Sequence, residues 1–90
     1  MTTLHILYGS ELPASLLRLW SDGDALLLAG ASVTLALRPG LALPRPCHAL
    51  TDAVHARGLA ERWPSGDITL IDSAGWVALV ARHDKSLSWS

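Results

Sequence analysis

The chain has 90 residues, of which 50% are hydrophobic and only 17% charged, and its formal net charge is −1. Its seven Lys and Arg residues are scattered, whereas direct nucleic-acid binding needs clustered cations that neutralise phosphates, so this class is disfavoured. The length fits one domain, residues 1–90, with a marginal core. Because so much apolar material exceeds what a small domain can hide, we expect an exposed apolar patch and an oligomer.

The single cysteine cannot form an internal disulfide, which suits a reducing compartment. The opening "MTTLHILYGS" has neither a basic segment nor a long apolar run, so no signal peptide is expected. The longest apolar stretch, "ALLLAGASVTLAL", is too short to span a bilayer. These features together predict a cytoplasmic protein without membrane contact.

The first elements read as strand, helix, strand. "TLHILY", residues 3–8, is a continuous apolar run typical of a buried strand. A helix follows, with Ser10 as its predicted N-cap, Pro13 in its first turn and Gly23 at its end. "ALLLA", residues 25–29, is a second strand. Neither strand alternates polar and apolar residues, which favours a parallel sheet covered on both faces.

The middle of the chain is less regular. Residues 32–37, "SVTLAL", fit either a short helix or a further strand, and residues 38–46 carry three prolines and a glycine and are predicted as a loop. "PCHAL" begins a third strand. Thr51 or Asp52 is then predicted to cap a short helix that Gly58 ends.

The last elements repeat this alternation. Residues 67–71 are a fourth strand, and residues 72–83 are a helix whose acidic start and basic end, Arg82 and His83, suit the helix dipole. Residues 86–90, "SLSWS", are predicted as an edge strand. The sequence therefore predicts a small three-layer α/β domain with a mostly parallel four- to five-stranded sheet flanked by helices.

Four segments in this order resemble the DsrH/TusB family of sulfur-relay subunits, in the DsrE-like superfamily. They are "LHILYGS", "SDGDALLLAGASVTLAL", "HALTDAVHARGL" and "ITLIDSAGWVALVARHDKSLSW". Most of the shared positions are packing residues, but their order and spacing cover nearly the whole chain.

The resemblance implies a DsrE-like fold and a heteromeric complex with two paralogous small subunits, called TusBCD or DsrEFH. These partners would be a TusC/DsrF-like and a TusD/DsrE-like chain. The complex carries persulfide sulfur, towards 2-thiolation of the wobble uridine of certain tRNAs in the Tus branch and into sulfur oxidation in the Dsr branch.

The sequence departs from the family pattern at three places. Leu16 stands where some members carry a cysteine on the first helix. Gly30 and Ala31 stand where many members have an acidic pair, which weakens a Dsr-type assignment. Cys47 stands where the family usually has an aliphatic residue, so the resemblance gives it no sulfur-carrying role.

Cys47 is nevertheless the one candidate nucleophile. A sulfur carrier needs an exposed thiolate near a positive charge. His48 follows Cys47 directly, but successive strand residues point to opposite faces, and His55 lies on the next predicted helix. The alternative interpretation is a small apolar core residue.

Other chemistry finds little support. The histidines form no paired zinc-ligand motif; His5 reads as a hydrogen-bonded core histidine and His83 as a helix-end contact. There is no G-x-S-x-G and no phosphate-binding G-x-x-x-x-G-K-[ST] motif. Asp67 and Asp72 flank a strand and read as turn and cap residues. No metal or cofactor is expected.

The four tryptophans divide into two groups. Trp20 and Trp76 have helical spacing and are predicted in the core. Trp63 and Trp89 are expected to be exposed unless a partner covers them, and with Leu87 they are candidate interface residues.

The sequence thus predicts a non-catalytic accessory subunit of a cytoplasmic sulfur-relay complex acting in tRNA wobble-uridine thiolation. Three alternatives stay open: a carrier with its persulfide on Cys47, a subunit of a sulfur-oxidation complex, and a homo-oligomeric binding module.

Overall fold

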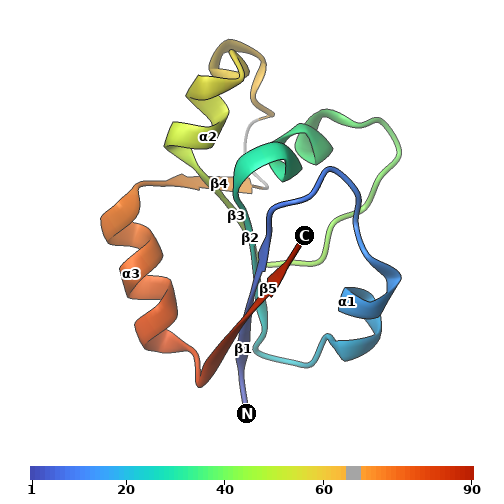
Figure 1. The fold of residues 1–90 in the computed structure, drawn as a ribbon, viewed down its shortest axis with the longest axis vertical. Coiled ribbons are helices and arrows are strands. Elements are labelled where there is room, and N and C mark those ends of the chain that lie inside the picture. The colour runs from blue at the N-terminus through green and yellow to red at the C-terminus, as the bar shows by residue number, and fades with distance from the viewer. Residues whose placement is uncertain (65–67) are drawn as a thin grey trace.

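A computed structural model describes residues 1–64 and 68–90, in which strands form a five-stranded sheet in the order β4-β3-β2-β1-β5 (Figure 1). All four pairings are parallel, so the predicted α/β architecture is confirmed. The strands are β1 (Thr3–Leu7), β2 (Ala25–Leu28), β3 (Cys47–Leu50), β4 (Ile68–Ile71) and β5 (Lys85–Trp89). The α-helices are α1 (Ala14–Leu19), α2 (Thr51–Ala56) and α3 (Ser73–Arg82), and the 3-10 helices are η1 (Gly30–Leu37) and η2 (Ala60–Arg62).

The sheet order follows from the hydrophobic pattern of the strands. Every residue of β1 and β2 is buried, as their unbroken apolar runs predict for strands covered on both faces. The predicted edge strand β5 does lie at an edge, paired only with β1. The predicted fourth strand is confirmed as β4, while its expected first residue, Asp67, lies outside the described residues.

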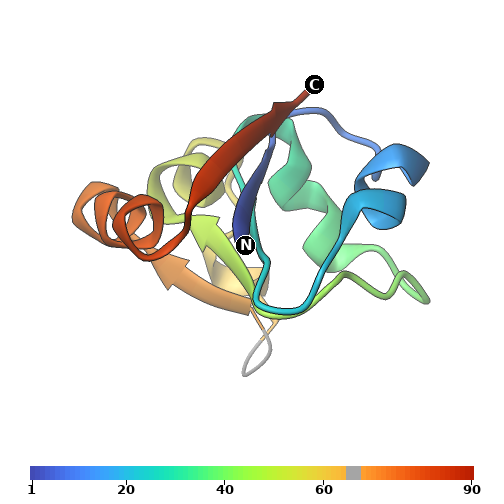
Figure 2. The same ribbon diagram turned by 90° about the horizontal axis from the view of Figure 1, so that it is seen from below.

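The sheet separates two apolar clusters because alternate strand residues point to opposite faces. On what we call the first face, strand residues such as Leu7, Leu26 and Ala49 pack with residues of α1, η1 and α2. On the second face, Leu4 and Leu27 are among the residues that pack with α3. Figure 2 shows α3 on the opposite side of the sheet from α1 and η1. The three predicted layers are present, but α3 is the only described helix on the second face.

The first helix is shorter than predicted. α1 begins at Ala14, with Pro13 in extended conformation as its N-cap, so the prediction of Ser10 as N-cap was wrong. The physical reason is Pro13, whose ring disfavours helical backbone at the preceding residue. The helix ends at Leu19, and Gly23, with φ +90°, belongs instead to the turn before β2.

The helix after β3 ends where predicted, but it begins without the predicted side-chain cap. α2 begins directly at the end of the strand without a side-chain cap, so neither Thr51 nor Asp52 caps it. The Thr51 hydroxyl instead donates to the Ile71 carbonyl of β4 at 3.0 Å. Gly58, with φ +66°, ends the helix as predicted, because its N–H and that of the next residue bond back to the last turn.

Two further expectations are settled by the structure. The ambiguous residues 32–37 lie in the 3-10 helix η1. Asp72 caps α3, accepting a hydrogen bond from the Gly75 N–H at 2.9 Å, and α3 ends at Arg82. Across residues 1–64 and 68–90, no helix is both long and apolar enough to cross a membrane.

Candidate functional site

Cys47 lies inside the core on the first face of the sheet. Its side chain is 2% exposed and packs in the same cluster as Leu26 and Ala49. Burial raises the pKa of the Cys47 thiol to about 12, although the charge of Arg45 acts in the opposite direction. The buried apolar position expected for this residue is therefore observed. Reaction with a sulfur donor needs an accessible thiolate, and this environment favours neither access nor ionisation.

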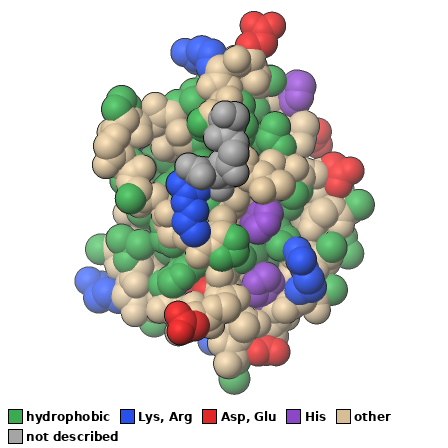
Figure 3. Space-filling view, turned by 180° about the vertical axis from the view of Figure 1, so that it is seen from behind, with side chains coloured by type: hydrophobic (Ala, Val, Ile, Leu, Met, Phe, Trp, Pro, Cys, Tyr) green, Lys and Arg blue, Asp and Glu red, His purple; other side chains and the backbone are tan. Residues whose placement is uncertain are grey.

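The histidines near Cys47 in sequence do not join it. His48 points to the second face, where it lines a hollow of about 350 Å³ together with Arg82 and His83. His55 is exposed on α2. Figure 3 shows histidine side chains gathered on this side of the molecule, with Lys or Arg side chains nearby. The fold thus brings together His48 and His83, two residues that are distant in sequence, and separates both from the thiol.

This hollow has little positive charge to offer an anion. Burial lowers the pKa of His48, the charges of Arg82 and His83 lower it further, and only the nearby Leu26 carbonyl acts to raise it. His48 Nδ1 is buried without a hydrogen-bond partner among the described residues. The His83 ring donates from Nδ1 to the Leu79 carbonyl at 2.6 Å, which is the helix-end contact expected for it. Arg82 is the permanently charged group among the residues that line the hollow.

His5 is the centre of a buried polar network, as expected for a hydrogen-bonded core histidine. Its Nε2 lies 2.9 Å from Asp24 Oδ2, and its Nδ1 accepts a hydrogen bond from the Trp89 indole N–H at 3.2 Å. The His5 ring also stacks with Trp20 and with Trp89, with ring centroids 5.1 and 6.1 Å away. Sequence reasoning missed Asp24 as the partner. Its signal was an acidic residue directly before a wholly apolar strand.

The remaining interface candidates are partly covered by the chain itself. Trp63 and Trp89 are half-buried and pack against the first-face core. The Trp63 indole N–H donates to the Ile68 carbonyl at 3.3 Å. Leu87 is half-buried on β5 and lines a small hollow of about 180 Å³. Trp63 lies beside β4 and the other two lie on β5, so the candidates are at opposite edges of the sheet.

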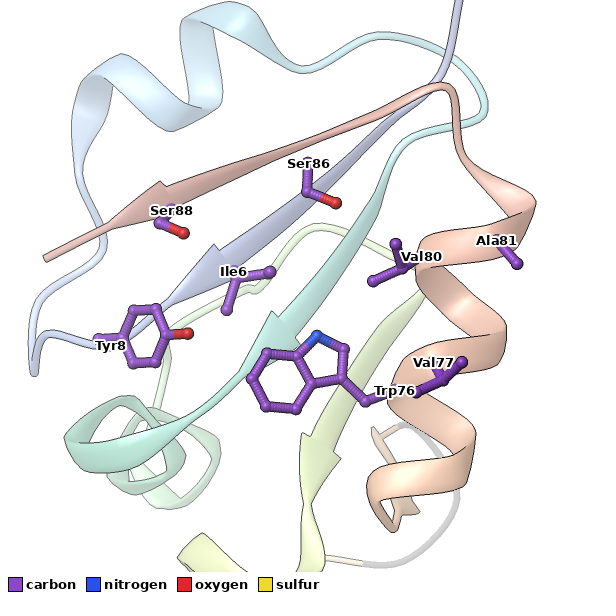
Figure 4. Close-up of a pocket in the computed structure, with 8 residues that line it drawn as sticks. All are labelled: Ile6, Tyr8, Trp76, Val77, Val80, Ala81, Ser86 and Ser88. Carbon is purple, nitrogen blue, oxygen red and sulfur yellow. The ribbon is translucent and has the colours of Figure 1, made fainter.

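An apolar groove lies on the second face, between α3 and the strands β1 and β5 (Figure 4). The composition predicted an exposed apolar patch but not its position. Its volume is about 560 Å³, and no charged side chain lines it. Three large hydrophobic side chains in its lining are exposed: Val77 at 69%, Val80 at 44% and Tyr8 at 41%. The lining residues are Ile6, Tyr8, Trp76, Val77, Val80, Ala81, Ser86 and Ser88. Trp76, predicted in the core, is half-buried at the border between the second-face cluster and this groove.

The described residues contain no assembled catalytic or metal centre. No three His, Cys, Asp or Glu side chains among them come close enough together to hold a metal ion. The His5–Asp24 pair is enclosed by tryptophans and backbone, and the one thiol is buried. The features of the described residues that face solvent are an apolar groove, a hollow lined by histidines and two sheet edges.

Sequence comparison relates this chain to known proteins. The model of the family described as "DsrH like protein" matches residues 9–86. Protein TusB of Escherichia coli strain K12 / DH10B is 39% identical over 82 residues, covering 84% of this chain and 85% of the relative. Protein TusB of E. coli O81 strain ED1a and of O1:K1 / APEC shows the same identity and coverage. The chain therefore belongs to the DsrH/TusB family.

Proposed function

We propose that this protein is an accessory, non-catalytic subunit of a cytoplasmic sulfur-relay complex of the TusBCD/DsrEFH kind. Family membership supports a role in sulfur relay. In this role the chain shapes an assembly in which a cysteine of another subunit carries the persulfide.

The observation that carries the accessory role is the burial of Cys47. It is the only cysteine of the chain, it is 2% exposed, and its pKa is raised to about 12. A persulfide carrier must meet both its donor and its acceptor, which requires a thiol at the surface with substantial thiolate character. With its single sulfhydryl inside the core, this chain is better suited to organise a relay than to carry sulfur.

We assign the contacts with two paralogous subunits to the two edges of the sheet. Trp63 lies beside β4, and Leu87 and Trp89 lie on β5. Half-buried aromatic residues at sheet edges can cover large apolar area in a complex while remaining packed against their own core, as is common at the centres of interfaces.

Within this family we propose the tRNA wobble-uridine thiolation branch over the sulfur-oxidation branch. The relatives at 39% identity are TusB proteins. Gly30 and Ala31, which begin η1, bring no carboxylate to the position where the resemblance places an acidic pair in many members. Lys and Arg are scattered along the chain, so the tRNA would be bound by another component of the pathway.

The test is a native pull-down of tagged protein with intact mass spectrometry. The expected result is two small paralogous subunits in fixed ratio, with about 32 Da, one sulfur atom, added to a partner's cysteine. A Cys47→Ala variant, which removes the thiol without adding a polar group, should support the same level of tRNA thiolation as wild type. Sulfur found on Cys47 itself, together with loss of thiolation in Cys47→Ala, would show instead that this chain is the carrier.

A further inference from the structure

The second face of the sheet is covered over only part of its width. Leu79 of α3 is buried against this face, while β1 and β5 form the floor of the open groove. Figure 4 shows Trp76 and Val80 projecting from α3 over the sheet, with no helix in front of β1 and β5. Parallel sheets normally have both faces covered. The groove therefore lies where a further helix would normally cover the sheet, and its lining is apolar, as for a covered surface.

The helix α3 is itself unusually apolar on its outer side. From Ser73 to Ala81 it contains no charged residue. Ala74, Val77, Ala78 and Ala81 are all exposed, at the i, i+3, i+4, i+7 spacing that forms one stripe along a helix. A helix that is apolar on all sides is typically buried on all sides, whereas a solvent-facing helix carries a polar stripe.

We propose that the groove binds α3 of a second copy of this chain, so that two copies associate about a two-fold axis and each α3 lies in the groove of the other. The two helices then share one layer between the two sheets, and each completes the cover of its partner's β1 and β5. The lengths agree: a ten-residue helix is about 15 Å long, and the five-residue strands on the groove floor are about 17 Å long.

The charges at the ends of α3 fit this arrangement. A two-fold axis near the middle of the helix, at Val77, makes the two copies of α3 antiparallel. Arg82, at the end of one α3, then lies near Asp72, the cap at the start of the other. Antiparallel helices also oppose their dipoles favourably. Because no charged side chain lines the groove between these ends, the pairing buries no unpaired charge.

A second copy fits better than an unrelated helix because one association covers both uncharged surfaces, the groove and the outer side of α3. The uncharged outer side of α3 is unusual for a surface helix, and the uncharged groove beside it is its complement. A solvated amphipathic helix from another protein would explain the groove but would leave the outer side of α3 exposed. The inference does not depend on the sulfur-relay assignment, since it uses a different surface from Trp63, Leu87 and Trp89.

Sedimentation equilibrium of the full chain tests the association. We expect a dimer at micromolar concentration, and at least about a tenfold higher dissociation constant for Val77→Asp, because the contact would bury two unpaired carboxylates. The matched control is Leu19→Asp, which places the same charge at a different exposed aliphatic residue, 56% accessible, on α1 across the sheet. Leu19→Asp should dimerise like wild type, and both variants should keep the wild-type circular dichroism spectrum.

Disulfide trapping tests the geometry. In a Cys47→Ala background, Val77→Cys should form a disulfide-linked dimer under mild oxidation, because Val77 lines the groove near the proposed axis. Its neighbour Ala78 is turned by about 100° around the helix onto the outer stripe, where it faces the partner's sheet and not its own copy across the axis, so Ala78→Cys should form no disulfide-linked dimer under the same conditions.

Each other outcome overturns the proposal. A wild-type chain that stays monomeric up to 100 µM, or equal effects of Val77→Asp and Leu19→Asp, would show that α3 makes no such contact. A co-expressed paralogous subunit that binds in a 1:1 complex, displaces the second copy and is itself lost on Val77→Asp would assign the groove to that subunit. Sulfur transfer is not measured in any of these experiments, so their failure is distinct from failure of the proposed function.

Discussion

His5 and Asp24 form the central polar contact of the fold, with 2.9 Å between His5 Nε2 and Asp24 Oδ2 in a fully enclosed environment. Asp24 also accepts backbone hydrogen bonds from Thr3 at 2.9 Å and from Ser21 at 3.0 Å. One carboxylate thus joins the start of β1 to the turn that leads into β2. Because Nδ1 of His5 accepts from Trp89, the proton of this ring is on Nε2 and is donated to Asp24.

The first prediction concerns acid stability through Asp24. Burial alone would raise the pKa of this carboxyl, but the hydrogen bonds from His5, Ser21 and Thr3 outweigh burial and lower it. A carboxyl whose folded pKa lies below its unfolded pKa stabilises the fold above the unfolded value, near 4, and this contribution is lost as pH falls through the folded pKa. Asp24→Asn should therefore cost about 2–3 kcal/mol of unfolding free energy at pH 7, and less at pH 3.

Urea unfolding of wild type and Asp24→Asn at both pH values measures this difference. Glu61→Gln serves as the control, because Glu61 is exposed on η2 and its replacement should change stability by less than about 0.5 kcal/mol at either pH. An equal cost of Asp24→Asn at pH 7 and pH 3 would contradict the role of the ionised carboxylate.

The second prediction concerns the bond between the C-terminal strand and the core. Trp89→Phe keeps an aromatic ring beside His5 but removes the N–H that donates to Nδ1. We expect a loss of about 1 kcal/mol, the usual net value of one hydrogen bond. Nitrogen-15 chemical shifts of the imidazole should show an Nδ1 without a proton in wild type. In Trp89→Phe they should show a changed distribution of the proton between Nδ1 and Nε2.

Trp63→Phe is the matched control for this measurement. The Trp63 N–H donates to the Ile68 carbonyl, away from His5, so its loss should leave the imidazole shifts unchanged. A wild-type spectrum with the proton on Nδ1 would contradict the arrangement of donors and acceptors around His5.

The sequence predicted those parts of the fold that depend on local pattern. The unbroken apolar runs that became β1 and β2 fixed them as central parallel strands, and Gly58 ended α2 because its φ of +66° suits glycine. The caps at Ser10, Thr51 and Asp52 were predicted from residue type alone. They failed because Pro13 delays the first helix, while the second follows its strand without a gap and uses Thr51 to bond β4.

The candidate site was less predictable because it depends on contacts between distant residues. Nothing in the sequence pairs His5 with Asp24 across two strands, or brings His48 and His83 to one hollow. The separation of Cys47 from His48 was predictable from strand alternation, and the burial of Cys47 from its apolar character. The groove was not predictable, because it lies where α3 leaves part of the second face uncovered. This depends on how the helix packs on the sheet and not on the sequence of any one segment.

The third prediction concerns the reactivity of Cys47. With a pKa of about 12, on the order of one thiol in ten thousand is ionised at pH 8, and the sulfur is also enclosed. Alkylation of the native protein should therefore proceed only through opening of the fold, and its rate should rise steeply with urea. Ser15→Cys in a Cys47→Ala chain provides an exposed thiol on α1 for comparison. Equal rates for Cys47 and the Ser15→Cys thiol in buffer without urea would show that Cys47 is accessible after all.

The last prediction compares Gly75, where a side chain would meet a close neighbour, with Gly58, where only the backbone conformation requires glycine. A Cβ at Gly75, in the first turn of α3, would lie 2.8 Å from the Cβ of Ile71 on β4, closer than packed side chains allow. Helix propensity favours alanine there by about 1 kcal/mol, so Gly75→Ala would be stabilising if no such contact existed. Overpacking costs about 1–3 kcal/mol, and we expect it to prevail, since the neighbouring atom is a branched Cβ fixed to the strand.

Gly58→Ala is the comparison, because a Cβ there meets nothing within 4 Å and only the positive φ of +66° opposes it. That change should cost about 1–2 kcal/mol through backbone strain alone. Thermal unfolding of both variants, with circular dichroism of the native state, separates the two causes. Adding Ile71→Ala should recover part of the loss in Gly75→Ala by removing the Ile71 Cγ2 atom, 3.3 Å from the new Cβ, and should recover nothing in Gly58→Ala. A stabilised Gly75→Ala protein would mean that α3 lies farther from β4 than this contact requires, and with it that α3 covers the second face less closely.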